Sequence, residues 1–167
     1  MSARRPLSRR ASTTVRAALV AWIGLLAVVL LAPSSAGPDW VIFHLSDALH
    51  GLGLPEGLAH PRRVEWVLNV AAFVPLGLLG SLLWTGPTWR DWTAVGFVAS
   101  LLVEAFQAVA LGARQATNAD VVANTLGMLL GALLGLLAGR ILGASTSEGG
   151  ADLPDRAPSA EELEPPR

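Results

Sequence analysis

The stretch DVVANTLGMLLGALLGLLAG, residues 120–139, decides the fold class of this chain. Its one charged residue, Asp120, is the first of the stretch. The uncharged residues that follow are long enough to cross a bilayer core, which needs about 20 apolar residues in a helix. Glycines recur at every fourth position and therefore share one helix face, where another backbone can pack closely. We expect a membrane-spanning helix with a glycine zipper formed by Gly127, Gly131, Gly135, Gly139 and, beyond the stretch, Gly143.

The rest of the chain has the same character. Of its 167 residues, 52% are hydrophobic and 15% are charged, whereas soluble domains carry about a quarter charged residues. Apolar runs predict an all-α membrane protein, a bundle of four transmembrane helices over residues 17–32, 64–84, 92–111 and 121–142. The connections between the last three helices are short, which favours antiparallel hairpins. The connection 33–63 is long, and we expect it to form a short amphipathic helix at the membrane surface.

Arginine placement predicts the orientation, because positively charged flanks stay in the cytoplasm. With the N-terminus inside, seven arginines of the N-terminus and helix flanks are cytoplasmic and three, Arg62, Arg63 and Arg114, are outside. Both termini are then cytoplasmic: an arginine-rich segment, 1–16, and an acidic, proline-rich tail, 143–167, that we expect to be disordered. As an alternative, the first segment is a signal peptide cleaved near Ser34–Ala36, which leaves three spans with unchanged sidedness.

Composition also excludes classes of partner. The 12 basic residues are balanced by 13 acidic ones, so no basic field exists for a nucleic-acid backbone, and no nucleic-acid partner is expected. The chain has no cysteine, so it has no disulfide or thiolate metal site, and we expect no cofactor. His44, Asp47 and His50 recur every three residues and are a metal-binding alternative. Residues at this spacing turn progressively around a helix, however, so we favour the interpretation that these side chains are solvated at the membrane interface.

Polar residues within the spans are expected to have a structural or functional role, because a charge at the centre of a membrane helix costs about 3 kcal/mol. In the predicted topology they all lie in the outer halves of their helices, or in the loop that joins two of them. We therefore predict one polar pocket open toward the outer leaflet. Its candidate ligand-binding residues are Asn69, Glu104, Gln107, Arg114, Asp120 and Asn124.

A second set of residues is predicted to be structural. Pro75 lacks an amide donor, so the carbonyl of Ala71 loses its usual partner and a neighbouring polar group is expected to satisfy it. Phe73 and Gly77 share a stripe with Asn69, and Gly96 and Ser100 share a stripe with Glu104, so these faces should meet other helices.

Three blocks of sequence resemble the VanZ-like family of small bacterial integral membrane proteins. They are NVAAFVPLG at residues 69–77, VEAFQ at 103–107 and RQATNADVVANTLG at 114–127, followed by Gly131. The resemblance implies a multi-pass protein of the bacterial cytoplasmic membrane, and a possible context in resistance to glycopeptides of the teicoplanin type.

Three functional hypotheses follow. In the first, the pocket recognises the polar headgroup of a membrane lipid or a lipid-linked cell-wall precursor, and Arg114 binds its phosphate. In the second, the protein is an enzyme acting on an isoprenoid-linked envelope substrate, with Glu104 or Asp120 as the candidate catalytic carboxyl. In the third, the polar residues only hold the helices together. The sequence does not predict an oligomeric state.

Overall fold

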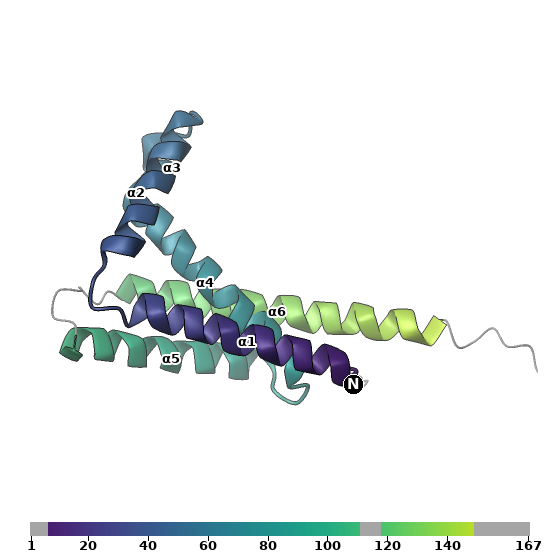
Figure 1. Cartoon of the computed structure of the whole chain (residues 1–167). Helices are drawn as coiled ribbons and strands as arrows, with labels where there is room; N and C mark the ends of the chain where they lie inside the picture. The colour runs from purple at the N-terminus through teal and green to yellow at the C-terminus, as the bar shows by residue number, and fades with distance from the viewer. Residues whose placement is uncertain (1–6, 111–117, 149–167) are drawn as a thin grey trace, which may run out of the picture.

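The computed structural model describes residues 7–110 and 118–148, and the side chains of the second range as far as Ile141. All regular structure in these ranges is helical, which confirms the predicted all-α class. The helices are α1 (Arg9–Leu30), α2 (Ala36–Gly51), α3 (Glu56–Ala59), α4 (Pro61–Leu83), α5 (Trp89–Ala110) and α6 (Asn118–Glu148). Figure 1 shows α1, α5 and α6 running along a common direction, with α4 crossing them at an angle.

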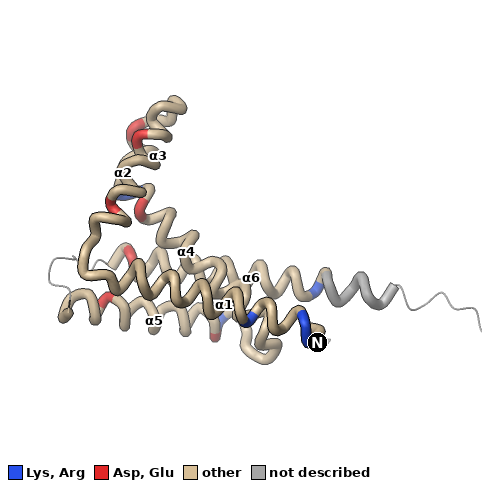
Figure 2. The backbone as a smooth tube through the Cα atoms, in the orientation of Figure 1, with Lys and Arg blue, Asp and Glu red and all other residues tan. Residues whose placement is uncertain are grey.

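Four helices are long and apolar enough to cross a membrane: α1, α4, α5 and the part of α6 from Asn118 to Ile141. They correspond to the four predicted spans. Figure 2 shows charged residues mainly toward the two ends of the bundle and on α2 and α3, while the middle of the bundle is almost free of charge. The start of α1 and the far end of α6 lie at the same end (Figure 1). The chain is therefore a multi-pass membrane protein.

The helices begin earlier than the apolar runs predict, because capping groups and not hydropathy set their ends. Ser8 Oγ accepts a hydrogen bond from Ala11 N at 3.3 Å, so α1 begins at Arg9 and not at residue 17. Pro61 occupies the first turn of α4, where its missing amide hydrogen costs nothing. Asp91 Oδ2 accepts from Thr88 N at 2.7 Å at the start of α5. At its other end α6 continues to Glu148, past the predicted end at residue 142.

The long connection forms α2 and α3, which project sideways from the bundle together with the first turns of α4 (Figure 1). Gly53 allows the turn between α2 and α3 because its φ is +84°, a value that side chains disfavour. Ser46 Oγ then donates to the Ala59 carbonyl at 2.5 Å, and both residues are buried. This bond fixes α2 against the segment that leads into α4.

The most extensive helix contact joins α4 and α6, and it is a contact between backbones. A Cβ placed on Gly131 would meet the Val74 carbonyl and lie 2.8 Å from Leu78 N. A Cβ on Gly77 would lie 2.7 Å from Ala132 N, and one on Gly135 2.7 Å from the Leu78 carbonyl. Only glycine allows this approach, because the opposing atoms belong to backbone that cannot swing aside.

Small residues also allow α5 to pack closely against α4 and α6. A Cβ on Gly96 would lie 2.7 Å from Met128 Cγ of α6, and one on Gly80 would lie 2.6 Å from the Trp92 ring. Gly96 and Ser100 are both buried, and Ser100 has no exposed surface. The predicted small and polar stripe of α5 therefore faces protein.

A tryptophan without a predicted role joins α1 to α4. Trp22 Nε1 donates to the carbonyl of Ala72 at 2.8 Å, three residues before Pro75. The sequence predicted a polar group at the carbonyl of Ala71, and the observed donor serves its neighbour instead. A proline ring disturbs the helical hydrogen bonds of the preceding turn, so an indole donor at this turn supports α4 where its own bonding is weakest.

We expect Gly131→Ala to lower the free energy of unfolding by about 1–3 kcal/mol, the usual cost of overpacking. The measurement is thermal unfolding of the purified protein in detergent. The matched control is Gly24→Ala on α1, where a Cβ meets nothing within 4 Å, so stability should hold or rise. Equal effects of the two substitutions would contradict the packing described for α4 and α6.

Candidate functional site

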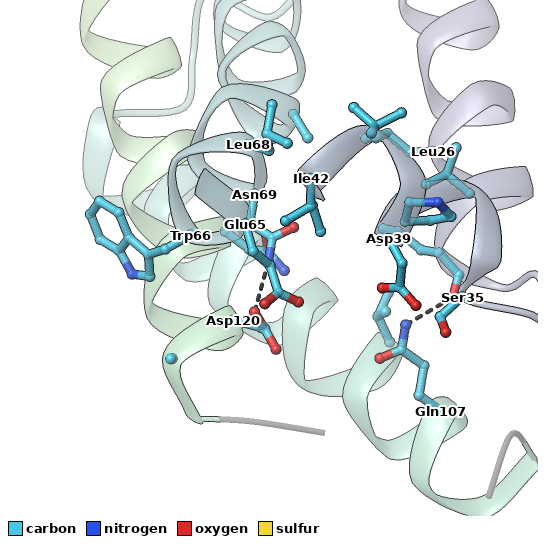
Figure 3. Close-up of a pocket in the computed structure, with 18 of the residues that line it drawn as sticks. Leu26, Ser35, Asp39, Ile42, Glu65, Trp66, Leu68, Asn69, Gln107 and Asp120 are labelled. Carbon is cyan, nitrogen blue, oxygen red and sulfur yellow. Dashed lines mark hydrogen bonds between the residues drawn. The ribbon is translucent and has the colours of Figure 1, made fainter. Parts of the chain in front are cut away.

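A cavity of about 1050 Å³ lies where α1 and α5 end and α6 begins. The side walls come from α2 and the first half of α4. Five of the six predicted ligand-binding residues line it, namely Asn69, Glu104, Gln107, Asp120 and Asn124. The sixth, Arg114, lies outside the described residues. Figure 3 shows side chains from several helices directed into this space.

The first polar contact of the cavity joins α4 to α6. Asn69 Nδ2 donates to Asp120 Oδ1 at 2.7 Å (Figure 3). Both residues are half-buried, and they lie next to the close backbone contact of the same two helices. A hydrogen bond to a charged acceptor is stronger than one between neutral groups, so this bond helps to fix the register of the two helices.

Asn124 connects α6 to α5 deeper in the bundle. Its Nδ2 donates to Ser100 Oγ at 2.9 Å. The residue is 3% exposed, and its Oδ1 is buried with no hydrogen-bond partner among the residues that the structure describes. An unpaired buried acceptor costs about 1–3 kcal/mol, so this oxygen is an energetic cost of the contact between α5 and α6.

Gln107 connects α5 to the end of α1. Its Nε2 donates to the carbonyl of Leu30 at 2.8 Å, and the side chain is 8% exposed. The last carbonyls of a helix have no partner within the helix, and Leu30 is the final residue of α1. The side chain of Gln107 on α5 therefore caps the C-terminus of α1.

The cavity includes polar residues that the sequence did not assign to the ligand-binding set. Ser35 and Asp39 come from the start of α2, and Arg62 and Glu65 come from the first turns of α4. No local motif marks Ser35 or Asp39. Their position depends on how α2 packs against α3 and α4, which a single sequence does not reveal. Their spacing of four residues is the one available signal, because it predicts a shared helix face.

Acidic side chains outnumber basic ones among the cavity residues that the structure describes. Among the described lining residues, Arg62 is basic, while the acidic ones are Asp39, Glu65, Glu104 and Asp120. Figure 3 shows Asp39 on one side and Glu65 and Asp120 on the other, with Gln107 near Asp39. The carboxyl groups come from α2, α4, α5 and α6, so the acidic lining is built by tertiary structure and not by one local run.

The remaining lining is mostly apolar. α1 contributes Leu26, Val29 and Leu30, and α2 contributes Val41 and Ile42. The wall that α1 forms is therefore apolar, whereas α2, α4 and α5 contribute both polar and apolar side chains.

The metal alternative finds no support in the described part of the chain, where no group of three ligating side chains comes together. His44 Nδ1 lies 2.8 Å from the Trp40 carbonyl, and His50 Nδ1 lies 3.0 Å from the Ser46 carbonyl. Each imidazole is thus engaged with the preceding turn of its own helix.

The predicted structural residues lie in the helix contacts. Phe73 is 3% exposed, and a Cβ on Gly127 would lie 2.8 Å from Phe73 Cβ. Pro75 lies inside α4, and Gly139 is half-buried on α6.

A double-mutant cycle on Asn69→Ala and Asp120→Ala should give a coupling free energy of about 1 kcal/mol, as for other interhelical hydrogen bonds in membranes. Unfolding of the two single variants and the double variant in detergent measures it. The same cycle on Asn69→Ala and the exposed Asp47→Ala should give a coupling near zero. Additive effects for the first pair would contradict a bond between Asn69 and Asp120.

Comparison with known proteins gives one assignment. Searches of curated proteins and of solved structures return no significant match. The sequence model of the VanZ/LLP1 family matches residues 17–139. This match runs from within α1 to most of α6 and includes every described residue of the cavity lining, so the chain belongs to the VanZ/LLP1 family.

Proposed function

We propose that the protein binds a membrane lipid or a lipid-linked envelope precursor, with the polar headgroup in the cavity and the hydrocarbon chain along its apolar wall. The observation that carries the proposal is the mixed lining: an apolar wall from α1 shares the cavity with carboxyl and amide groups from α2, α4, α5 and α6. An amphiphile matches both kinds of lining, whereas a small soluble ligand matches only one.

The size of the cavity supports this ligand class. Pockets for drug-sized molecules have volumes of about 300–1000 Å³, and this one has about 1050 Å³. It is large enough for a headgroup together with the first part of a hydrocarbon chain. It also lies at one end of the transmembrane helices, where headgroups meet acyl chains.

The cost of the polar lining supports binding over a purely structural role. Asn69, Gln107 and Asn124 each donate one hydrogen bond that joins helices. Helix association does not account for the inward position of Asp39. Polar groups without compensating interactions destabilise a membrane protein, and they are found mainly at functional sites.

The arginine distribution supports an outward-facing cavity in the bacterial cytoplasmic membrane, because the opposite ends of α1, α5 and α6 carry Arg9, Arg90 and Arg140. A lipid-linked cell-wall precursor presents its headgroup there during envelope synthesis. The teicoplanin-type resistance context belongs to the same proposal, since a precursor bound by this protein would be presented differently to a glycopeptide antibiotic.

Filling the apolar wall should displace the ligand. We expect Val29→Trp to lose most of the lipid retained by the wild-type protein, because Val29 lines the cavity. Val28→Trp is the matched control, since Val28 is 72% exposed and lies outside the lining. Native mass spectrometry of protein released gently from membranes measures retained lipid. Equal retention by both variants and the wild type would refute binding in this cavity.

Cysteine labelling tests the sidedness, and the cysteine-free sequence makes single substitutions clean. Leu52→Cys lies beyond α2 and Gly86→Cys lies between α4 and α5. In intact cells an impermeant maleimide should label the first and not the second, and permeabilised cells should show both. The reverse pattern would place the cavity on the cytoplasmic side.

A further inference from the structure

We infer that a surface groove on the first turns of α4 binds the phosphate of a membrane lipid and favours a dianionic phosphate over a phosphodiester. The groove has a volume of about 450 Å³ and is lined by Arg62, Arg63, Trp66 and Val67. A lipid that ends in a phosphomonoester or a diphosphate has the required charge. This inference goes beyond the proposed function, because the groove adjoins the cavity and binds its ligand whether or not the cavity holds a headgroup.

The residues of the groove form one face of α4. Arg62 and Trp66 are four residues apart, as are Arg63 and Val67, so each pair lies on neighbouring turns of the same side of the helix. All four residues are exposed. The two guanidinium groups belong to the first turn of this membrane span, and the two apolar side chains follow one turn deeper. A lipid presents its phosphate and its hydrocarbon chain in the same order.

The positive charge of the groove is not used within the protein. The guanidinium groups of Arg62 and Arg63 form no hydrogen bond or ion pair with the residues that the structure describes. Glu65 lies close to them in sequence, but it lines the cavity and not the groove. Figure 3 shows Trp66 pointing away from Glu65 and from the cavity. Two adjacent positive charges therefore share a groove that has no carboxylate among its described lining residues.

The side chains, and not the start of the helix, supply the donors for a phosphate. Pro61 has no amide hydrogen, Arg62 N donates to His60 Nδ1 at 3.2 Å, and Arg63 N donates to the His60 carbonyl at 2.8 Å. A guanidinium can bind a phosphate through two parallel hydrogen bonds. Two guanidinium groups match the charge of a phosphate monoester, which is about −1.5 to −2 at pH 7. A phosphodiester carries one negative charge and balances only half of the site.

The apolar half of the groove favours a lipid over a free phosphate ion. Tryptophan is enriched at the level of the headgroups, where its ring contacts both apolar and polar groups. Trp66 and Val67 are exposed on a helix that is apolar enough to cross the membrane. They can therefore contact the glycerol and the first part of the hydrocarbon chain of a lipid. Inorganic phosphate would leave this half of the groove without a partner.

The side of the membrane is a separate argument for an anionic ligand. In the orientation that the arginine distribution supports, Arg62 and Arg63 lie on the outer side, where arginine is disfavoured. Two consecutive arginines at the outer start of a helix oppose the bias of the rest of the chain. A negatively charged partner in the outer leaflet accounts for their presence.

The test is competition between two lipids with identical acyl chains. The full-length protein is placed in nanodiscs of equal parts palmitoyl-oleoyl phosphatidic acid and palmitoyl-oleoyl phosphatidylglycerol at about pH 8, where the monoester approaches two negative charges. Native mass spectrometry identifies the retained lipid, and the wild type should retain phosphatidic acid preferentially. Arg63→Gln should lower the ratio of phosphatidic acid to phosphatidylglycerol about tenfold, the effect of losing one charge-assisted hydrogen bond. Arg63 is chosen because it lines the groove and not the cavity.

The matched control is Arg90→Gln, which removes the same charge at the start of α5, outside the groove and the cavity. The Arg90 guanidinium lies 5.2 Å from the centre of the Trp89 ring, and its loss should leave the ratio unchanged. An equal fall in both variants would show a general charge effect and overturn the inference. Equal retention of the two lipids by the wild type would also overturn it. The proposed function would then still stand, because Val29→Trp tests the cavity separately.

Soluble competitors test the inference on the wild type in detergent without any variant. Glycerol 3-phosphate, a monoester, should displace the retained phosphatidic acid, and glycerophosphoglycerol, a diester, should displace less of it. Inorganic phosphate separates the two sources of the phosphate group. Weaker displacement by inorganic phosphate than by glycerol 3-phosphate would support a lipid ligand, and equal displacement would support recognition through the phosphate alone. Equal displacement by the monoester and the diester would refute the preference for a dianion.

Discussion

The contact on which the structure depends is the backbone approach of α4 to α6. Glycines on both helices meet carbonyl and amide groups of the other, so no side chain separates the two at Gly77 and Gly131. In a membrane, where no hydrophobic effect drives helices together, such dispersion contacts supply much of the association. The approach also has a consequence for the cavity: it brings Asn69 within hydrogen-bond distance of Asp120.

In addition to packing, single directional bonds join α1 and α5 to this pair and to each other. Asn124 reaches Ser100 on α5, Gln107 of α5 reaches the end of α1, and Trp22 of α1 reaches Ala72 on α4. These bonds link α1, α4, α5 and α6 in a closed circuit, because the last returns to the central pair. Each bond is modest in energy, yet together they set the rotation of each helix and hence which side chains face the cavity.

Apolar length was sufficient to predict the four spans, and antiparallel connections brought five of the six polar candidates to one depth. The ends of the helices were not predictable from hydropathy, because Ser8 and Pro61 act through local backbone chemistry. The contribution of Asp39 was missed for a different reason. Its position depends on how α2 packs against α3 and α4, and the bond between Ser46 and Ala59 in this contact joins residues 13 apart and leaves no periodic signal.

The structural and ligand-binding interpretations of the polar residues are compatible. The amide of Asn124, a residue of the cavity lining, uses its nitrogen to hold α5. Packing alone would be served as well by an apolar side chain of similar volume, since replacing buried polar pairs by hydrophobic groups is often neutral or stabilising. Polar side chains that are held in place by helix contacts and also line the cavity are instead what a preorganised site requires, because their geometry is set before the ligand arrives.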